Sequence, residues 1–263
     1  MKKLLLPILA AVTSLVASCS TYQISTISST NSIKDDKTGV FYFENDSVKI
    51  SYSFYGNNAP ISIKVYNKLD KPLYVDWQRS AAIVGNEAYS YASDKVNING
   101  NINALTYNDN NWNRRAAFGA LNLTSGSLNA VAELPKNITF LPPHAQIANV
   151  PLNLTQGTLH VPESSLHKEK VKLFGDVGDV QANVKTADFT KENSPLLFKS
   201  YLTLYTQNGS EVKPVAFQHE FYVSKVVSTQ TEPGFFPQYQ VQRGDFFFNN
   251  SPIGDNKALA AQE

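Results

Sequence analysis

The sequence contains one cysteine and one methionine among its 263 residues, and its charges nearly cancel. A single cysteine cannot form an internal disulfide, which excludes a fold that is stabilised by internal disulfides. The balance of 23 basic and 22 acidic residues lacks the electrostatic footprint of a nucleic-acid-binding protein. No apolar run of about 18 residues follows the N-terminal segment, so no later segment is predicted to span a membrane.

Motifs for catalysis and for cofactors are also missing. The sequence has no Gly-x-Ser-x-Gly elbow, no P-loop and no glycine-rich dinucleotide turn. No two of the four histidines have the His-x-x-x-His spacing of a helical zinc site; they are His144, His160, His167 and His219. Segment 175–179 carries two aspartates without the ligand spacing of an EF-hand, and a plain loop is favoured over a calcium site. We therefore predict a non-enzymatic protein without metal or cofactor.

The abundant residues favour β-strands. The sequence has thirteen tyrosines and fifteen phenylalanines, which favour strands, and it has few runs of helix-forming residues. Apolar residues alternate with polar ones over 48–54, 61–66, 73–77 and 215–223, and residues between these runs form turns. Strands and turns recurring about every ten residues are typical of all-β proteins. We predict an antiparallel β-sandwich, immunoglobulin-like in general architecture, with long loop insertions.

The predicted sandwich spans residues 39–228 and is interrupted once. Residues 93–136 are rich in asparagine and are predicted to form a long loop. Within them, 112–121 could be a short helix or a buried loop across one end of the sandwich. After the sandwich, 229–263 form an aromatic C-terminal extension that ends in a disordered tail.

The N-terminus has the features of a secretion signal over residues 1–18. Two lysines precede an apolar core that is too short for a spanning helix. The segment 16–19, Val-Ala-Ser-Cys, resembles the lipobox of bacterial lipoproteins, which implies that Cys19 is lipidated. The alternative is an ordinary signal peptide with an incidental cysteine. By the same resemblance, Ser20 favours sorting to the outer membrane. Residues 19–38 are rich in serine and threonine and are predicted to be a flexible tether.

Three short segments resemble uncharacterised lipoproteins of Bacteroidota. They are Asn-Lys-Leu-Asp-Lys-Pro-Leu-Tyr-Val-Asp-Trp at 67–77, Ile-Thr-Phe-Leu-Pro-Pro at 138–143 and Phe-Tyr-Val-Ser at 221–224. The resemblance covers residues 40–226. It implies an envelope location and a β-rich fold, and it brings no catalytic residues.

Two polar residues and one pair of charged residues have specific interpretations. Asp46-Ser47-Val48 resembles the O-glycosylation acceptor of Bacteroidota, which makes Ser47 a possible modification site, although such short motifs also occur by chance. His219 lies on the apolar face of its strand, where a hydrogen-bonded core histidine is favoured over a ligand-binding one. Asp76, with Arg79 three residues later, is predicted to form a cross-strand or local ion pair.

Aromatic residues offer the one positive indication of binding. Five of them could line a sugar- or peptide-binding surface, or instead belong to the core and the sheet edges: Trp77, Tyr89, Tyr91, Tyr107 and Trp112. Trp112 and Tyr107, in the predicted loop, are the strongest candidates. The sequence thus favours a lipid-anchored envelope protein that serves as an interaction or structural module. The alternative is a carbohydrate-binding sandwich, so the expected partners are the membrane and an envelope protein or glycan.

Overall fold

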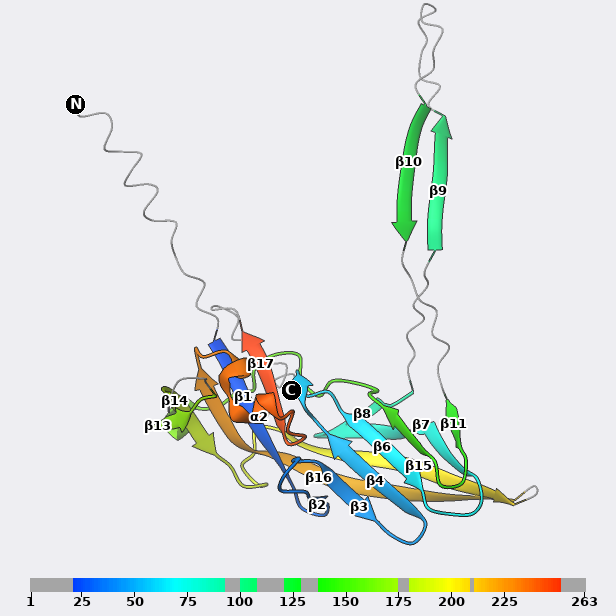
Figure 1. Ribbon diagram of the computed structural model, residues 1–263, viewed down its shortest axis with the longest axis horizontal. Coiled ribbons are helices and arrows are strands. Elements are labelled where there is room, and N and C mark those ends of the chain that lie inside the picture. Colours follow the sequence, from blue (N-terminus) through cyan, green and yellow to red (C-terminus); the bar gives the residue numbers. More distant parts are fainter. Residues whose placement is uncertain are drawn as a thin grey trace, which may run out of the picture. The chain divides into compact units, whose positions relative to one another are not determined.

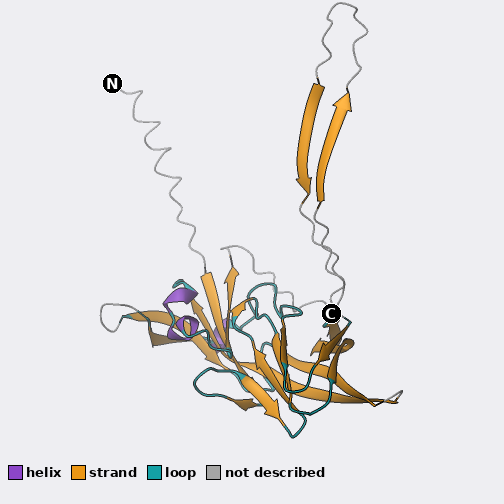
Figure 2. Ribbon diagram, turned by 45° about the vertical axis from the view of Figure 1, so that its right-hand side comes forward, coloured by secondary structure: helices purple, strands orange, loops and turns teal. Residues whose placement is uncertain are grey.

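The computed structural model describes residues 21–92, 100–107, 121–128, 137–174, 180–208 and 211–251, with the backbone alone for the second and third ranges. Two sheets pack face to face, which confirms the predicted all-β sandwich (Figure 1). Strands dominate, and helix is limited to the short segments η1 (Glu163–Ser165), η2 (Pro233–Phe235) and α2 (Pro237–Gln240) within the described residues (Figure 2). None of the helices in these ranges has the length and hydrophobicity needed to cross a membrane.

The larger sheet contains ten strands, seven of which follow the order β11-β7-β15-β16-β1-β17-β5. Its strands are β1 (Thr21–Ser29), β5 (Gly56–Asn57), β7 (Leu73–Val84), β8 (Glu87–Ser90), β11 (Ile138–Leu141), β13 (His167–Lys172), β14 (Gln181–Asp188), β15 (Leu197–Asn208), β16 (Glu211–Thr229) and β17 (Phe246–Ser251). Beside this path, β8 pairs with β7, and β14 pairs with both β13 and β16. Neighbours are antiparallel except for β17 and β5.

The smaller sheet has five strands in the order β12-β6-β4-β3-β2. They are β2 (Ile33–Lys34), β3 (Phe41–Glu44), β4 (Val48–Ser53), β6 (Ser62–Asn67) and β12 (Gln146–Asn149). In β4, alternate residues are buried and half-buried, as its sequence pattern predicted. The side chains of its buried face are Val48, Ile50 and Tyr52, and they point toward the larger sheet.

Aromatic side chains fill the space between the sheets. Phe54 contacts Phe198 and Phe221 edge-on, with ring centroids 5.3 and 5.0 Å apart, and Tyr52 contacts Phe221 at 5.1 Å. Each of these rings is almost completely buried. Edge-to-face pairs at such distances add roughly 0.5–1.5 kcal/mol each beyond their buried area. These phenylalanines therefore serve the core.

The predicted tether over residues 19–38 is wrong for the part that the structure describes. Residues 21–29 form β1, which pairs with β16 on one side and β17 on the other, and Ile33–Lys34 form β2. The Gln23 side chain is buried and exchanges two hydrogen bonds with the backbone of Leu159. β1 is a central strand, and some of its polar side chains, such as Gln23 and Ser28, bond to distant parts of the protein. It therefore lacks the apolar alternation by which strands are recognised.

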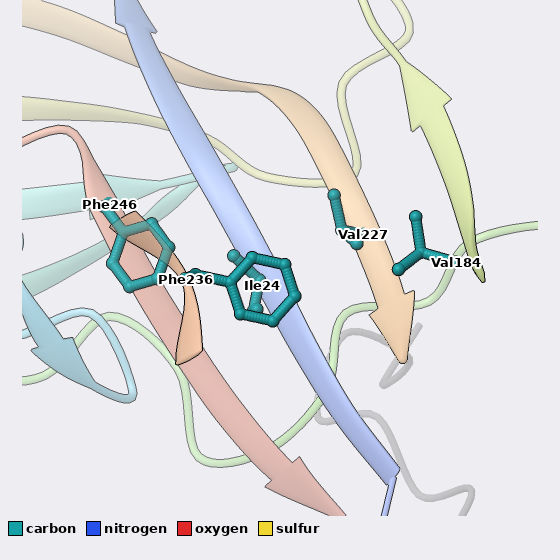
Figure 3. Packing of buried hydrophobic residues seen from close by; sticks show 5 residues of the cluster. All are labelled: Ile24, Val184, Val227, Phe236 and Phe246. Carbon is teal, nitrogen blue, oxygen red and sulfur yellow. The ribbon is translucent and has the colours of Figure 1, made fainter. Parts of the chain in front are cut away.

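The C-terminal boundary at residue 228 is also wrong. Phe246–Ser251 form β17, and Phe247 is fully buried. A second hydrophobic cluster joins this end of the chain to the sheet; its members are Ile24, Val184, Val227, Phe236 and Phe246 (Figure 3). The aromatic extension is therefore part of the sandwich. Residues 252–263, predicted as a tail, lie outside the described residues.

The predicted loop 93–136 instead contains a β-hairpin. This part of the chain, residues 92–137, forms a compact unit of its own. Its strands β9 (Gly100–Tyr107) and β10 (Leu121–Leu128) pair antiparallel, with Tyr107 opposite Leu121. Asparagine is uncommon in strands, but backbone hydrogen bonds pair two strands whatever their side chains. Residues 108–120, including most of the predicted helix or loop, lie outside the described residues.

Candidate binding surface

The aromatic residues singled out in the sequence have different environments. Trp77 and Tyr91 are buried in the core, whereas Tyr89 is 47% exposed on the edge strand β8. Trp112 is outside the described residues, and of Tyr107 only the backbone is described, as the last residue of β9. The structure thus removes Trp77 and Tyr91 from a binding surface, and the roles of Trp112 and Tyr107 stay predictions.

The proposed modification sites can be placed only in part. Cys19, the signal segment 1–18 and the segment 175–179 lie outside the described residues. Ser47 lies in the turn between β3 and β4 and is half-buried. The Asn45 side chain accepts hydrogen bonds from the backbone N–H groups of Ser47 and Val48, which fixes the turn. The glycosylation of Ser47 and the lipidation of Cys19 remain predictions.

His219 is a hydrogen-bonded core histidine, as predicted. Its Nδ1 is hydrogen-bonded to the Tyr52 hydroxyl at 3.0 Å. Two further hydroxyls extend this hydrogen-bonded series. The Ser200 hydroxyl donates a hydrogen bond to the Tyr52 hydroxyl at 3.3 Å, and the Tyr91 hydroxyl donates one to Ser200 at 2.9 Å. Burial lowers the pKa of His219 to about 4 and raises the pKa of both tyrosine hydroxyls. The imidazole is therefore neutral at pH 7. Because the Tyr52 oxygen already accepts from Ser200, we assign its O–H as the donor to an unprotonated Nδ1, which ends the series.

This network of Tyr52, Ser200, Tyr91 and His219 serves the core. All four residues are almost completely buried, so a substrate could not reach the Ser200 hydroxyl. The Ser200 hydroxyl bonds to Tyr52 and Tyr91, whereas a serine nucleophile needs an adjacent base to take its proton. Within the described residues, no group of three or more His, Cys, Asp or Glu side chains could hold a metal ion.

A row of aromatic side chains crosses the outer face of the larger sheet. Phe140 on β11 lies opposite Tyr74 on β7, and Tyr74 lies opposite Tyr205 on β15. The rings of Phe140 and Tyr74 meet edge-on with centroids 5.6 Å apart, whereas those of Tyr74 and Tyr205 stack at 4.9 Å and 6°. Phe140 is 54% exposed, and the two tyrosines are half-buried. We call Phe140, Tyr74 and Tyr205 the aromatic row.

A buried carboxylate lies beside the aromatic row. Asp76 is the next outward-facing residue of β7 after Tyr74, between Ile138 on one neighbouring strand and Thr203 on the other. Its carboxylate accepts a hydrogen bond from the backbone N–H of Arg79 at 3.1 Å. The Arg79 Nε lies 3.7 Å from the same carboxylate, which confirms the predicted ion pair. Burial and then the Asp76 charge raise the pKa of Tyr205.

The backbone of β7 is irregular at this point. The register between β7 and β15 shifts between Tyr201 and Thr203, and the Thr203 hydroxyl and N–H bond to Arg79 and Ser80 across the shift. Such shifts of register, like β-bulges, change the direction in which side chains point and are frequent next to functional sites. Here the shift leaves the Arg79 side chain largely exposed beside the aromatic row. The outer face thus combines exposed aromatic, aliphatic and guanidinium groups.

Sequence reasoning missed this surface. Tyr74, Phe140 and Tyr205 occupy the positions of their strands that alternate with core residues, and that alternation is visible in the sequence. What the sequence does not show is that β11, β7 and β15 are neighbours, since β15 begins more than 110 residues after β7. Their alignment side by side depends on the sheet order.

Comparison with known proteins adds no identity to these observations. No protein-family model, no curated protein and no solved structure matches the chain.

Proposed function

We propose that this protein is a non-enzymatic binding module of the bacterial cell envelope, anchored through lipidated Cys19, which recognises a protein partner through the aromatic row. The observation that carries the proposal is the exposed row on the outer face of the larger sheet. Aromatic residues and arginine are enriched in protein interfaces, and both groups are present here. The signal segment and the lipobox-like residues 16–19 support the anchor and the outer-membrane location.

Ring geometry favours a protein partner over a carbohydrate. A sugar stacks on the open face of an aromatic ring, but Tyr74 and Tyr205 cover one face of each other at 4.9 Å. Only Phe140, which meets its neighbour edge-on and is half exposed, offers a substantially open ring. Exposed apolar groups around an exposed arginine that pairs with a buried carboxylate suit the mixed surface of another protein. A carbohydrate ligand is the second candidate, because Phe140 and the predicted contacts Trp112 and Tyr107 could supply ring faces.

The test uses the mature chain in a soluble form that begins at residue 20 and lacks Cys19, and compares it with two of its variants as baits for solubilised envelope proteins. Phe140→Ser removes the most exposed ring of the row, and Tyr89→Ser removes a similarly exposed ring from β8 in the same sheet. We expect one or more proteins bound by the mature chain and by Tyr89→Ser to be retained at least about tenfold less by Phe140→Ser. Thermal melts establish that both variants remain folded.

Two outcomes contradict the proposal. Equal retention of every captured protein by Phe140→Ser and by the mature chain shows that the aromatic row is not the binding surface. Binding to purified envelope glycans that is reduced by Phe140→Ser and unaffected by Tyr89→Ser, without a captured protein, establishes the carbohydrate alternative instead.

A further inference from the structure

The folded sandwich begins almost at the expected lipid anchor. β1 starts at Thr21, two residues after Cys19, and it is a central strand of the larger sheet. A chain spans at most about 3.6 Å per residue, so Cys19 lies within about 7 Å of the start of β1. Acyl chains on Cys19 would therefore hold the sheet at the bilayer surface. The inference below depends on this proposed lipidation.

Exposed apolar side chains gather near this end of the larger sheet. Phe174 and Phe235 are 52% and 51% exposed, and the Phe174 N–H donates a hydrogen bond to the Phe235 carbonyl at 2.6 Å. Val180 is also exposed, and its carbonyl accepts a hydrogen bond from the backbone N–H of Leu173 at 2.9 Å. We call Phe174, Val180 and Phe235 the apolar patch. The hydrogen bonds bring Phe235 close to Phe174 and Val180, which lie far from it in the sequence.

The packing beneath the apolar patch ties it to the first half of β1. Phe236, which follows Phe235, belongs to the buried cluster with Ile24 and Val227 (Figure 3). Ile24 is three residues after Thr21, which is roughly 10 Å along a strand. Val227 lies opposite Ile24 in the sheet. The patch and the attachment point of the lipid thus lie over the same part of the molecule.

We propose that the apolar patch inserts into the lipid bilayer and that the sandwich rests directly on the membrane. Two phenylalanines and a valine beside a tethered strand are suited to the boundary between headgroups and acyl chains. The anchor keeps the patch at a high local concentration of lipid, so even a weak apolar contact is populated. The apolar side chains of the patch and its position near the lipid anchor both identify a lipid bilayer as the surface that the patch contacts.

This arrangement places the aromatic row far from the lipid anchor. Tyr205 pairs with Pro214 on β16, and Pro214 precedes Thr229, the residue beside the start of β1, by 229 − 214 = 15 positions. Fifteen residues of strand correspond to about 50 Å. β16 runs along the larger sheet between these points (Figure 1). Membrane contact and partner binding therefore take place at opposite ends of one strand.

The test uses the full acylated chain in vesicles of phosphatidylethanolamine and phosphatidylglycerol, with or without brominated acyl chains. Phe235→Trp places a fluorescent reporter in the apolar patch. Val215→Trp is the matched control, because Val215 is 54% exposed and lies on β16, 14 residues before Thr229. Native Trp77 and Trp112 are present in both variants, so the difference between the variants reports the added ring.

We expect brominated lipids to quench the added fluorescence of Phe235→Trp at least about twofold more than that of Val215→Trp. Equal quenching in vesicles that carry the protein overturns membrane contact by the patch and leaves the lipid anchor intact. If the wild-type chain does not float with the vesicles, both the proposed anchor and this inference are wrong. Flotation and quenching thus separate the two failures.

Discussion

Single side chains in this core are defined by their hydrogen-bond partners as much as by burial. Tyr91 donates a hydrogen bond to Ser200, and Ser200 donates one to Tyr52. The Tyr52 hydroxyl in turn bonds to the His219 Nδ1. A buried hydroxyl without an acceptor costs about 1–3 kcal/mol, so the neutral imidazole stabilises the whole series. His219→Phe alone is expected to cost about that much, because it leaves the Tyr52 hydroxyl without its acceptor.

The pKa of His219 predicts how stability changes with pH. It is about 4 in the folded protein against an ordinary value of 6.5, so the unfolded chain binds a proton that the folded protein excludes between these values. The free energy of unfolding should therefore decrease as the pH falls from 6.5 toward 4, with a contribution approaching about 1.4 kcal/mol per pH unit. Urea denaturation across this range measures the slope. The double variant Tyr52→Phe, His219→Phe removes both partners and should have a flatter profile; an unchanged slope contradicts the assignment.

Among the elements, β1 decides where the domain starts. It pairs with β16 through residues 22–29 and with β17 through residues 21–26, and it contributes buried Ile24 and Ile27. Burial of an isoleucine side chain is worth roughly 2–5 kcal/mol by truncation to alanine. Two such residues account for much of the 5–15 kcal/mol by which a typical domain is stable.

Removal of β1 is therefore expected to unfold the sandwich. A chain beginning at Gly39, the start predicted from the sequence, should show no cooperative thermal transition, because β16 and β17 lose the strand between them. A chain beginning at Ser20 is the control and should unfold cooperatively. Calorimetry of the two chains decides the matter, and similar melting temperatures would contradict a central role for β1.

At the scale of the whole molecule, residues 92–137 form the hairpin unit. We expect this unit to be dispensable for folding of the sandwich. Its flanks return to neighbouring points of β7: the Tyr91 N–H bonds to the Ser80 carbonyl, and Ile138 pairs with Asp76. These points are 80 − 76 = 4 residues apart, or about 13 Å. A flexible linker of about five residues can span this distance.

Replacement of residues 93–136 by such a linker should change the melting temperature of the sandwich by no more than about 4 °C, which corresponds to roughly 1–2 kcal/mol. The physical reason is that both flanking strands keep their pairing with β7. Differential scanning calorimetry provides the measurement, with the chain from residue 20 as reference. A loss of more than about 10 °C would show that the sandwich depends on the hairpin unit.

The sequence by itself determined the fold class and much of the core. Alternation in β4, β6 and β16 correctly placed Tyr52, Val65 and His219 on buried faces, because a strand that covers a core must present every second side chain to it. Local patterns of this kind depend only on neighbouring residues along the chain, so they can be read without knowledge of the sheet order.

Only the tertiary structure decided the roles of β1, β17 and the aromatic row. The buried Gln23 side chain is satisfied by the backbone of Leu159, 136 residues away, and the sequence does not reveal that partner. Tyr74 and Tyr205 stack because β7 and β15 are neighbours in the sheet, although 131 positions separate them in the chain. Strand order arises from long-range packing, and it creates both the polar central strand and the exposed surface.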